Sequence, residues 1–166
     1  MTQADTASAT LTPALMTPES LLAHWQGHRR LTRRVIEAFP EDQLFTFTAA
    51  PPMRSFGEMA WEVVGLVDYL LKGLDTGDWS WTPPSEQPAQ DLSALLAAWD
   101  AQTPQLEAAL PAFPIPRYLE KKDMAWGYFS PLETVQYLVD NEIHHRGQGY
   151  VYLRALGIEP PPFYER

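Results

Sequence analysis

SPLETVQYLVDNEIHHRGQGYVYLRALG, residues 130–157, predicts one long helix with signals at both ends. Ser130 is a favoured N-cap residue, Pro131 suits the first helical position, and Glu133 completes a capping box with Ser130. Gly157 ends the helix, because glycine adopts the left-handed backbone of a helix C-terminus without strain. We expect this segment to be the fourth and last helix of the fold.

Three segments upstream carry comparable signals and predict helices: residues 17–39, 55–74 and 91–110. Thr17 and Ser55 are N-cap residues of the first two, and the third begins at or near Asp91. Pro104 lies inside the third segment, where a proline kinks a helix or makes it restart. Four long amphipathic helices with no convincing strand partner predict an all-α four-helix bundle. Residues 111–130 form a short irregular segment before the last helix, in which a hairpin is one alternative.

The domain organisation follows from the length and from the composition of the first residues. The 166 residues are enough for one domain with one sizeable core. Residues 1–16 are small and polar, and we expect them to form a loose N-terminal arm. Residues 17–166 are expected to form the single bundle domain, since no internal repeat points to a second unit.

Charge and cysteine content exclude several classes of function. The chain has 12 Lys plus Arg against 21 Asp plus Glu, a net charge of -9, which argues against binding nucleic acid or an anionic membrane. The absence of cysteine excludes disulfides, thiolate metal sites and cysteine nucleophiles. No apolar run reaches the length of a membrane span, and the first residues lack the basic and apolar regions of a signal peptide. We therefore expect a cytoplasmic protein.

The last predicted helix carries a row of polar side chains on a face that is expected to look inward. Five residues share this face: Leu138, Asn141, His145, Gln148 and Tyr152. His144 lies about 100° away from His145 around the helix axis and is expected to be the more exposed of the two histidines. Polar groups inside an apolar bundle are costly unless they are hydrogen-bonded or bind something. His145 is therefore the candidate functional histidine.

Metal-binding motifs can be compared with this helix. The HExxH motif of zinc proteases is absent. Glu142 and His145 have the Glu-x-x-His spacing of di-iron bundles, but the sequence holds no second copy. A mononuclear site needs only about three ligands that converge from different helices.

Residues 142–148, EIHHRGQ, followed by residues 152–162, YLRALGIEPPP, resemble the C-terminal helix of the DinB-like (YfiT-like) superfamily. Residues 21–44 and 54–71 resemble its first two helices, so the resemblance covers nearly the whole chain. It implies a four-helix bundle of up-down-down-up type and a homodimer. It also implies a metal-dependent enzyme of thiol-transferase or hydrolase type, with a small-molecule substrate such as a thiol conjugate.

The resemblance also implies a ligand set. Family members commonly hold a divalent ion through three histidines, one on the second helix and two on the last. The second histidine of the last helix matches His145, whereas the other two positions hold Asn141 and Glu62. The implied metal ligands are His145, Glu62 and Asn141, for zinc, nickel or manganese, and the implied catalytic residues are Glu62 and His145.

Several alternatives stay open at this point. His28 lies on the inward stripe of the first helix and either packs in the core or reaches the Glu62/His145 cluster as a replacement ligand. Glu62 is either a ligand or a carboxylate paired with Arg146 or His145. The protein as a whole is either an enzyme or a catalytically inactive, metal-free bundle that serves as a small-ligand or protein-interaction module.

Two smaller features have similar pairs of interpretations. The aromatic loops at residues 78–81 and 124–130 either line the mouth of a pocket or cover the ends of the core. Gly147 and Gly149 are expected to permit a close approach of a neighbouring helix.

Overall fold

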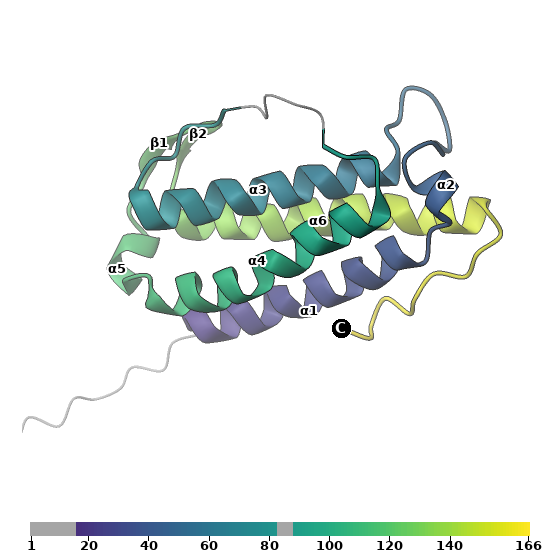
Figure 1. The fold of residues 1–166 in the computed structure, drawn as a ribbon. Helices are drawn as coiled ribbons and strands as arrows, with labels where there is room; N and C mark the ends of the chain where they lie inside the picture. Colours follow the sequence, from purple (N-terminus) through teal and green to yellow (C-terminus); the bar gives the residue numbers. More distant parts are fainter. Residues whose placement is uncertain (1–15, 83–87) are drawn as a thin grey trace, which may run out of the picture.

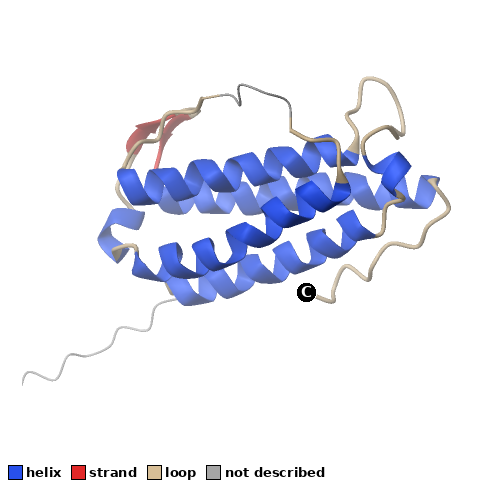
Figure 2. Ribbon diagram, in the orientation of Figure 1, coloured by secondary structure: helices blue, strands red, loops and turns tan. Residues whose placement is uncertain are grey.

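The structure is a computed structural model that describes residues 16–82 and 88–166. The loose arm predicted for residues 1–16 lies, apart from Met16, outside the described residues. The helices and strands are α1 Pro18–Glu37, α2 Glu41–Leu44, α3 Phe56–Thr76, α4 Leu92–Ala112, α5 Ile115–Tyr118, β1 Lys122–Met124, β2 Gly127–Phe129 and α6 Pro131–Ala155. The long helices α1, α3, α4 and α6 pack along one another, with the hairpin at one end of the bundle (Figures 1 and 2). The predicted all-α four-helix bundle is confirmed.

The long helices begin where their caps predict. Thr17, Ser55 and Ser130 each close a capping box at the start of α1, α3 and α6. Asp91 caps α4 by accepting from the amide of Ala94, its third residue. Of the two alternatives for Pro104, a kink or a restart, the restart is wrong, because α4 continues through this residue. Local side-chain chemistry therefore places each helix start.

The order of the helices around the bundle decides which of them can contribute residues to one site. Each of α1 and α3 packs against both α4 and α6, so the helices follow one another around the bundle as α1, α4, α3 and α6. Helices α1 and α6 run in one direction and α3 and α4 in the other (Figure 1), which confirms the up-down-down-up topology. The predicted site residues on α3 and α6 therefore lie on two neighbouring helices that pack directly against each other.

Close approach of α3 and α6 depends on one glycine of the last helix. A β-carbon at Gly149 would lie 2.6 Å from Cε2 of Phe56, whereas a β-carbon at Gly147 would meet nothing within 4 Å. The prediction of close helix packing is confirmed at Gly149 and wrong at Gly147. Phe56 and Tyr152 belong to the core at this end of the bundle.

The segment before α6 is more ordered than the sequence indicates. Residues 115–118 form the short helix α5, and β1 pairs with β2 as an antiparallel hairpin, in which Asp123 lies opposite Tyr128. This outcome selects the hairpin alternative. Among the helices that the structure describes, none is both long and apolar enough to cross a membrane.

Candidate functional site

Glu62, on α3, is the centre of a polar cluster that bridges α3 and α6. Nε2 of His145 lies 3.1 Å from its Oε1, and Nδ2 of Asn141 donates to the same oxygen over 3.2 Å. Nη1 of Arg54 lies 2.6 Å from the other oxygen, Oε2. The three predicted site residues therefore meet at one point, and Arg54 joins them. Of the two partners considered for Glu62, His145 is correct and Arg146 is wrong.

These neighbours stabilise the ionised form of Glu62. The hydrogen bond from His145 is the largest influence, and those from Arg54 and Asn141 act in the same direction, against the effect of partial burial. Together they lower the pKa of Glu62 to about 2, from an ordinary value of 4.5. Glu62 is therefore a carboxylate near neutral pH and a weak proton acceptor.

The tautomer of His145 follows from its contact with Glu62. Because a carboxylate accepts hydrogen bonds, Nε2 of His145 carries a proton in this contact. Nδ1 of His145 and Oδ1 of Asn141 are buried and have no hydrogen-bond partner among the described residues. Nδ1, the imidazole nitrogen that faces away from Glu62, is thus enclosed in the bundle.

The fit of a divalent ion can be tested on these contacts. Each group that touches Glu62 does so through a hydrogen-bond donor, and the guanidinium of Arg54 already balances its charge. An ion bound between Glu62, Asn141 and His145 would need the amide of Asn141 to turn its oxygen toward the ion and Nε2 of His145 to lose its proton. Among the described residues, no three His, Asp or Glu side chains gather closely enough to hold a metal ion. The arrangement as it stands does not fit a resident divalent ion.

A second polar cluster lies on the other side of α6, against α1. The fully buried carboxylate of Glu142 accepts from Nε1 of Trp25 over 3.0 Å and from the hydroxyl of Thr32 over 2.6 Å. Nη1 of Arg146 lies 3.7 Å from this carboxylate. Burial is the main influence on its pKa and raises it, while Arg29, Thr32, Trp25 and Arg146 act in the opposite direction.

His28 belongs to this second region and does not replace a lost metal ligand. Its Nδ1 lies 3.0 Å from Nη2 of Arg146, and its Nε2 lies 2.9 Å from Nη1 of Arg166. Burial and the two guanidinium groups lower the pKa of His28 to about 4, with a smaller contribution from His24. The idea that His28 reaches the Glu62/His145 cluster is therefore wrong, because its side chain is held between two arginines.

A cleft of about 480 Å³ opens beside Glu62. Twelve residues line it: Phe45, Arg54, Glu58, Trp61, Glu62, Gly65, Leu66, Trp81, Pro88, Gln90, Trp126 and Tyr137. We call it the aromatic pocket. Glu62 and Arg54 reach it, whereas His145 and Asn141 lie behind Glu62 and do not line it. Of the two interpretations of the aromatic loops, the pocket is correct for Trp81 and Trp126, while the core is correct for the buried Trp79.

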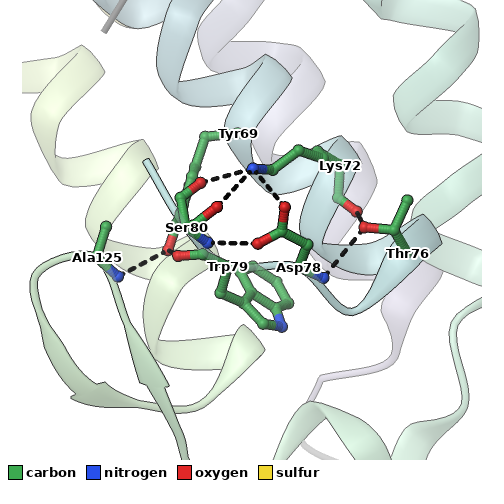
Figure 3. Close-up of polar contacts among 7 residues, drawn as sticks. All are labelled: Tyr69, Lys72, Thr76, Asp78, Trp79, Ser80 and Ala125. Carbon is green, nitrogen blue, oxygen red and sulfur yellow. Dashed lines mark hydrogen bonds and ion pairs between the residues drawn. The ribbon is translucent and has the colours of Figure 1, made fainter. Parts of the chain in front are cut away.

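Polar contacts fasten the two aromatic loops to α3 (Figure 3). The hydroxyl of Tyr69 donates to the carbonyl of Trp79 over 3.0 Å, and the amide of Ala125 donates to the same carbonyl over 3.1 Å. Nζ of Lys72 donates to Asp78 over 3.1 Å and to the carbonyl of Ser80 over 2.6 Å. The backbone next to Trp81 and Trp126 is thereby fixed to α3, and both indoles pack against the ring of Tyr69, so they form a preformed wall.

The sequence could have predicted some residues of this pocket but not others. Tyr137 lies one turn before Asn141 on α6, so helical spacing from the predicted site would have pointed to it. Trp61 directly precedes Glu62 and lies about 100° away around α3, so the same spacing does not point to it. Arg54 precedes the N-cap of α3, and no periodic pattern assigns a partner to a residue outside a helix.

Comparisons with known proteins agree with this architecture. A family model described as the DinB family matches residues 8–166. The uncharacterized protein YjoA of Bacillus subtilis (strain 168) is 21% identical over 147 residues, which cover 88% of this chain and 95% of that protein.

Solved structures match at the level of the fold. The crystal structure of the DinB-like protein YjoA from Bacillus subtilis superposes with a TM-score of 0.71 at 20% identity, covering 88% of this chain and 97% of that one. A DinB-like protein from Bacillus cereus ATCC 10987 gives the same TM-score, identity and coverage. Because the family model spans nearly the whole chain, the chain belongs to the DinB family.

Proposed function

We propose that this protein binds a small organic molecule in the aromatic pocket, as the metal-free alternative predicts. The observation that carries the proposal is the ion pair of Arg54 and Glu62, which reaches a pocket walled by Trp61, Trp81 and Trp126. Small-molecule sites typically combine apolar and aromatic walls with a few fixed polar groups, and this pocket has that composition.

The protonation states support binding more than acid–base catalysis. A carboxylate whose pKa is lowered to about 2, as for Glu62, is a poor proton acceptor near neutral pH. His145, the other predicted catalytic residue, directs Nε2 at Glu62 and keeps Nδ1 buried, away from the pocket. Neither group is therefore placed to move a proton on a molecule in the pocket.

A binding screen with a blocked pocket tests the proposal. Ligand-observed NMR would be run with a panel of small cationic, anionic, neutral and aromatic compounds against the wild type and Gly65→Leu. Gly65 lines the pocket, and a β-carbon there already lies 3.4 Å from Cη2 of Trp81, so leucine fills the space. Gly147→Leu is the matched control, since Gly147 is an exposed helical glycine with open space around it.

Binding of at least one compound to the wild type and Gly147→Leu, and its loss in Gly65→Leu, is the expected result. A panel in which no compound binds, or in which Gly65→Leu changes nothing, would overturn the proposal.

The metal-dependent enzyme implied by the family resemblance is the second candidate. One observation favours it: His145 and Asn141 both direct a polar atom at Oε1 of Glu62, over 3.1 and 3.2 Å. Elemental analysis after loading with zinc, nickel or manganese would compare the wild type, His145→Ala and Arg54→Gln. Stoichiometric metal that His145→Ala abolishes and Arg54→Gln increases would support this candidate. Equal trace amounts in all three proteins would refute it.

A further inference from the structure

The aromatic rings of the pocket are arranged as a concave wall. The ring centroids of Trp81 and Trp126 lie 5.6 Å apart with planes inclined at 45°, and those of Trp126 and Tyr137 lie 6.5 Å apart at 41°. A slot that sandwiches a flat ring needs two nearly parallel faces, which neither pair supplies. Inclined rings instead present several faces to one compact group, as in sites that bind ammonium ions.

These rings are accessible to a ligand. Trp81, Trp126 and Tyr137 are 36%, 48% and 53% exposed, although the backbone beside both tryptophans is fixed to α3. Large aromatic side chains held rigidly at an accessible surface are typical of recognition sites. The wall is therefore preformed and requires little reorganisation on binding.

The charges that line the pocket leave one carboxylate without a cationic partner. Arg54 and Glu62 neutralise each other over 2.6 Å. Glu58 uses Oε2 to accept from the amide and hydroxyl of Ser55 over 2.9 and 2.8 Å. No ion pair formed within residues 16–82 and 88–166 involves Glu58. The lining therefore carries one net negative charge, in a chain whose net charge of -9 already favours the approach of cations.

We infer that the ligand of the aromatic pocket carries a small organic ammonium group, which lies against the faces of Trp81 and Trp126, in a pocket whose lining owes its net negative charge to the carboxylate of Glu58. The inference rests on the proposed function, because it names the ligand class of the same pocket. A cation gains from the negative ring faces and from the carboxylate, whereas a neutral group of the same shape gains only from burial.

Two probes of matching shape test the charge directly. Choline and its neutral isostere 3,3-dimethylbutan-1-ol would be titrated into the full chain by ligand-observed NMR or calorimetry. Choline is expected to bind about tenfold more tightly, as a cation–π contribution with a carboxylate nearby predicts.

Matched variants assign the effect to the named side chains. Glu58→Gln keeps the capping box, since glutamine also suits that position, and is expected to weaken choline binding about threefold to tenfold. Glu133→Gln makes the same change in the capping box of α6, outside the pocket, and should leave binding unaltered. Trp126→Leu is expected to weaken choline binding by a similar factor, with the exposed Tyr128→Leu of the same hairpin as its control.

The outcomes separate this inference from the proposed function. Equal binding of choline and its isostere, both lost in Gly65→Leu, would overturn the ammonium assignment and leave the pocket as a binding site. The assignment also fails if choline does not bind the wild type, whereas the screen of the full panel decides the proposed function on its own. Choline binding that Glu58→Gln leaves unchanged would equally overturn the role given to that carboxylate.

Discussion

Trp25 of α1 donates its indole N–H to the carboxylate of Glu142 on α6 over 3.0 Å, across a separation of 117 residues in sequence. Thr32 donates to the same carboxylate, and Arg146 lies 3.7 Å from it. This cluster is buried between the first and last helices. Its hydrogen bonds and its nearby cation explain how Glu142, a charged residue, can be fully buried on the face of α6 that packs into the core. Its polar contacts join α1 to α6.

Removing the carboxylate of Glu142 is expected to lower the free energy of unfolding. Glu142→Ala leaves the buried N–H of Trp25 without its acceptor and the buried charge of Arg146 without its anionic partner, and it should lower the free energy of unfolding by about 3 to 5 kcal/mol. Glu142→Gln keeps an acceptor oxygen and should cost less. Urea denaturation checks both variants, with the more exposed Glu133→Gln as control. A loss below about 1 kcal/mol for Glu142→Ala would contradict this role.

Alanine substitutions at the two glycines of the last helix should change the free energy of unfolding in opposite directions. Gly149→Ala places a β-carbon 2.6 Å from the buried ring of Phe56 and should lower the free energy of unfolding by about 1 to 2 kcal/mol. Gly147→Ala meets open space and should raise it by up to about 1 kcal/mol, because alanine is the better helix former. Thermal unfolding of both variants provides the measurement, and equal effects would show that α3 and α6 do not pack closely at Gly149.

His28 should make stability depend on mildly acidic pH. Its pKa is about 4 in the folded chain and about 6.5 when unfolded, so the unfolded state binds the proton first. Stability is therefore expected to fall as the pH drops from about 6.5 to about 4, by up to about 3 kcal/mol. Urea denaturation at several pH values would compare the wild type with His28→Gln, which should flatten this decrease.

His144→Gln is the control for that experiment, because His144 is exposed and lies on the outer side of α6. A decrease between pH 6.5 and 4 that is the same in the wild type and in His28→Gln would show that Arg146 and Arg166 do not act on the imidazole as their distances indicate.

The hydroxyl of Tyr69 is expected to hold the aromatic pocket in shape. Tyr69→Phe removes the donor to the carbonyl of Trp79, and it should lower the free energy of unfolding by about 1 kcal/mol. It should also speed proteolysis in the hairpin, since the amide of Ala125 meets the same hydroxyl over 3.4 Å. Tyr137→Phe, at an exposed phenol of the pocket, is the control. Unchanged proteolysis in Tyr69→Phe would mean that other contacts fix the loops.

The helices and their starts could be predicted from local chemistry. Thr17, Ser55, Asp91 and Ser130 each accept from the amide three residues further on, so their effect does not depend on the rest of the fold. The topology, and the contact of Glu62 with Asn141 and His145, could be predicted because the family resemblance supplied a known arrangement of helices. The homodimer that it also implies stays a prediction, which light scattering at several concentrations would check.

The sequence could not predict which charged residues lie beside Glu62 and His28 and shift their pKa values. Arg54 lies outside any helix and reaches Glu62 with a long side chain, while His28 is held by Arg146 and by Arg166, which is far away in sequence. Helical spacing relates residues within three or four positions, whereas charge pairing and pocket shape depend on distances between side chains of different elements. The three predicted ligands thus meet in the fold, while packing alone decided that Arg54 joins them and that an aromatic pocket opens beside Glu62.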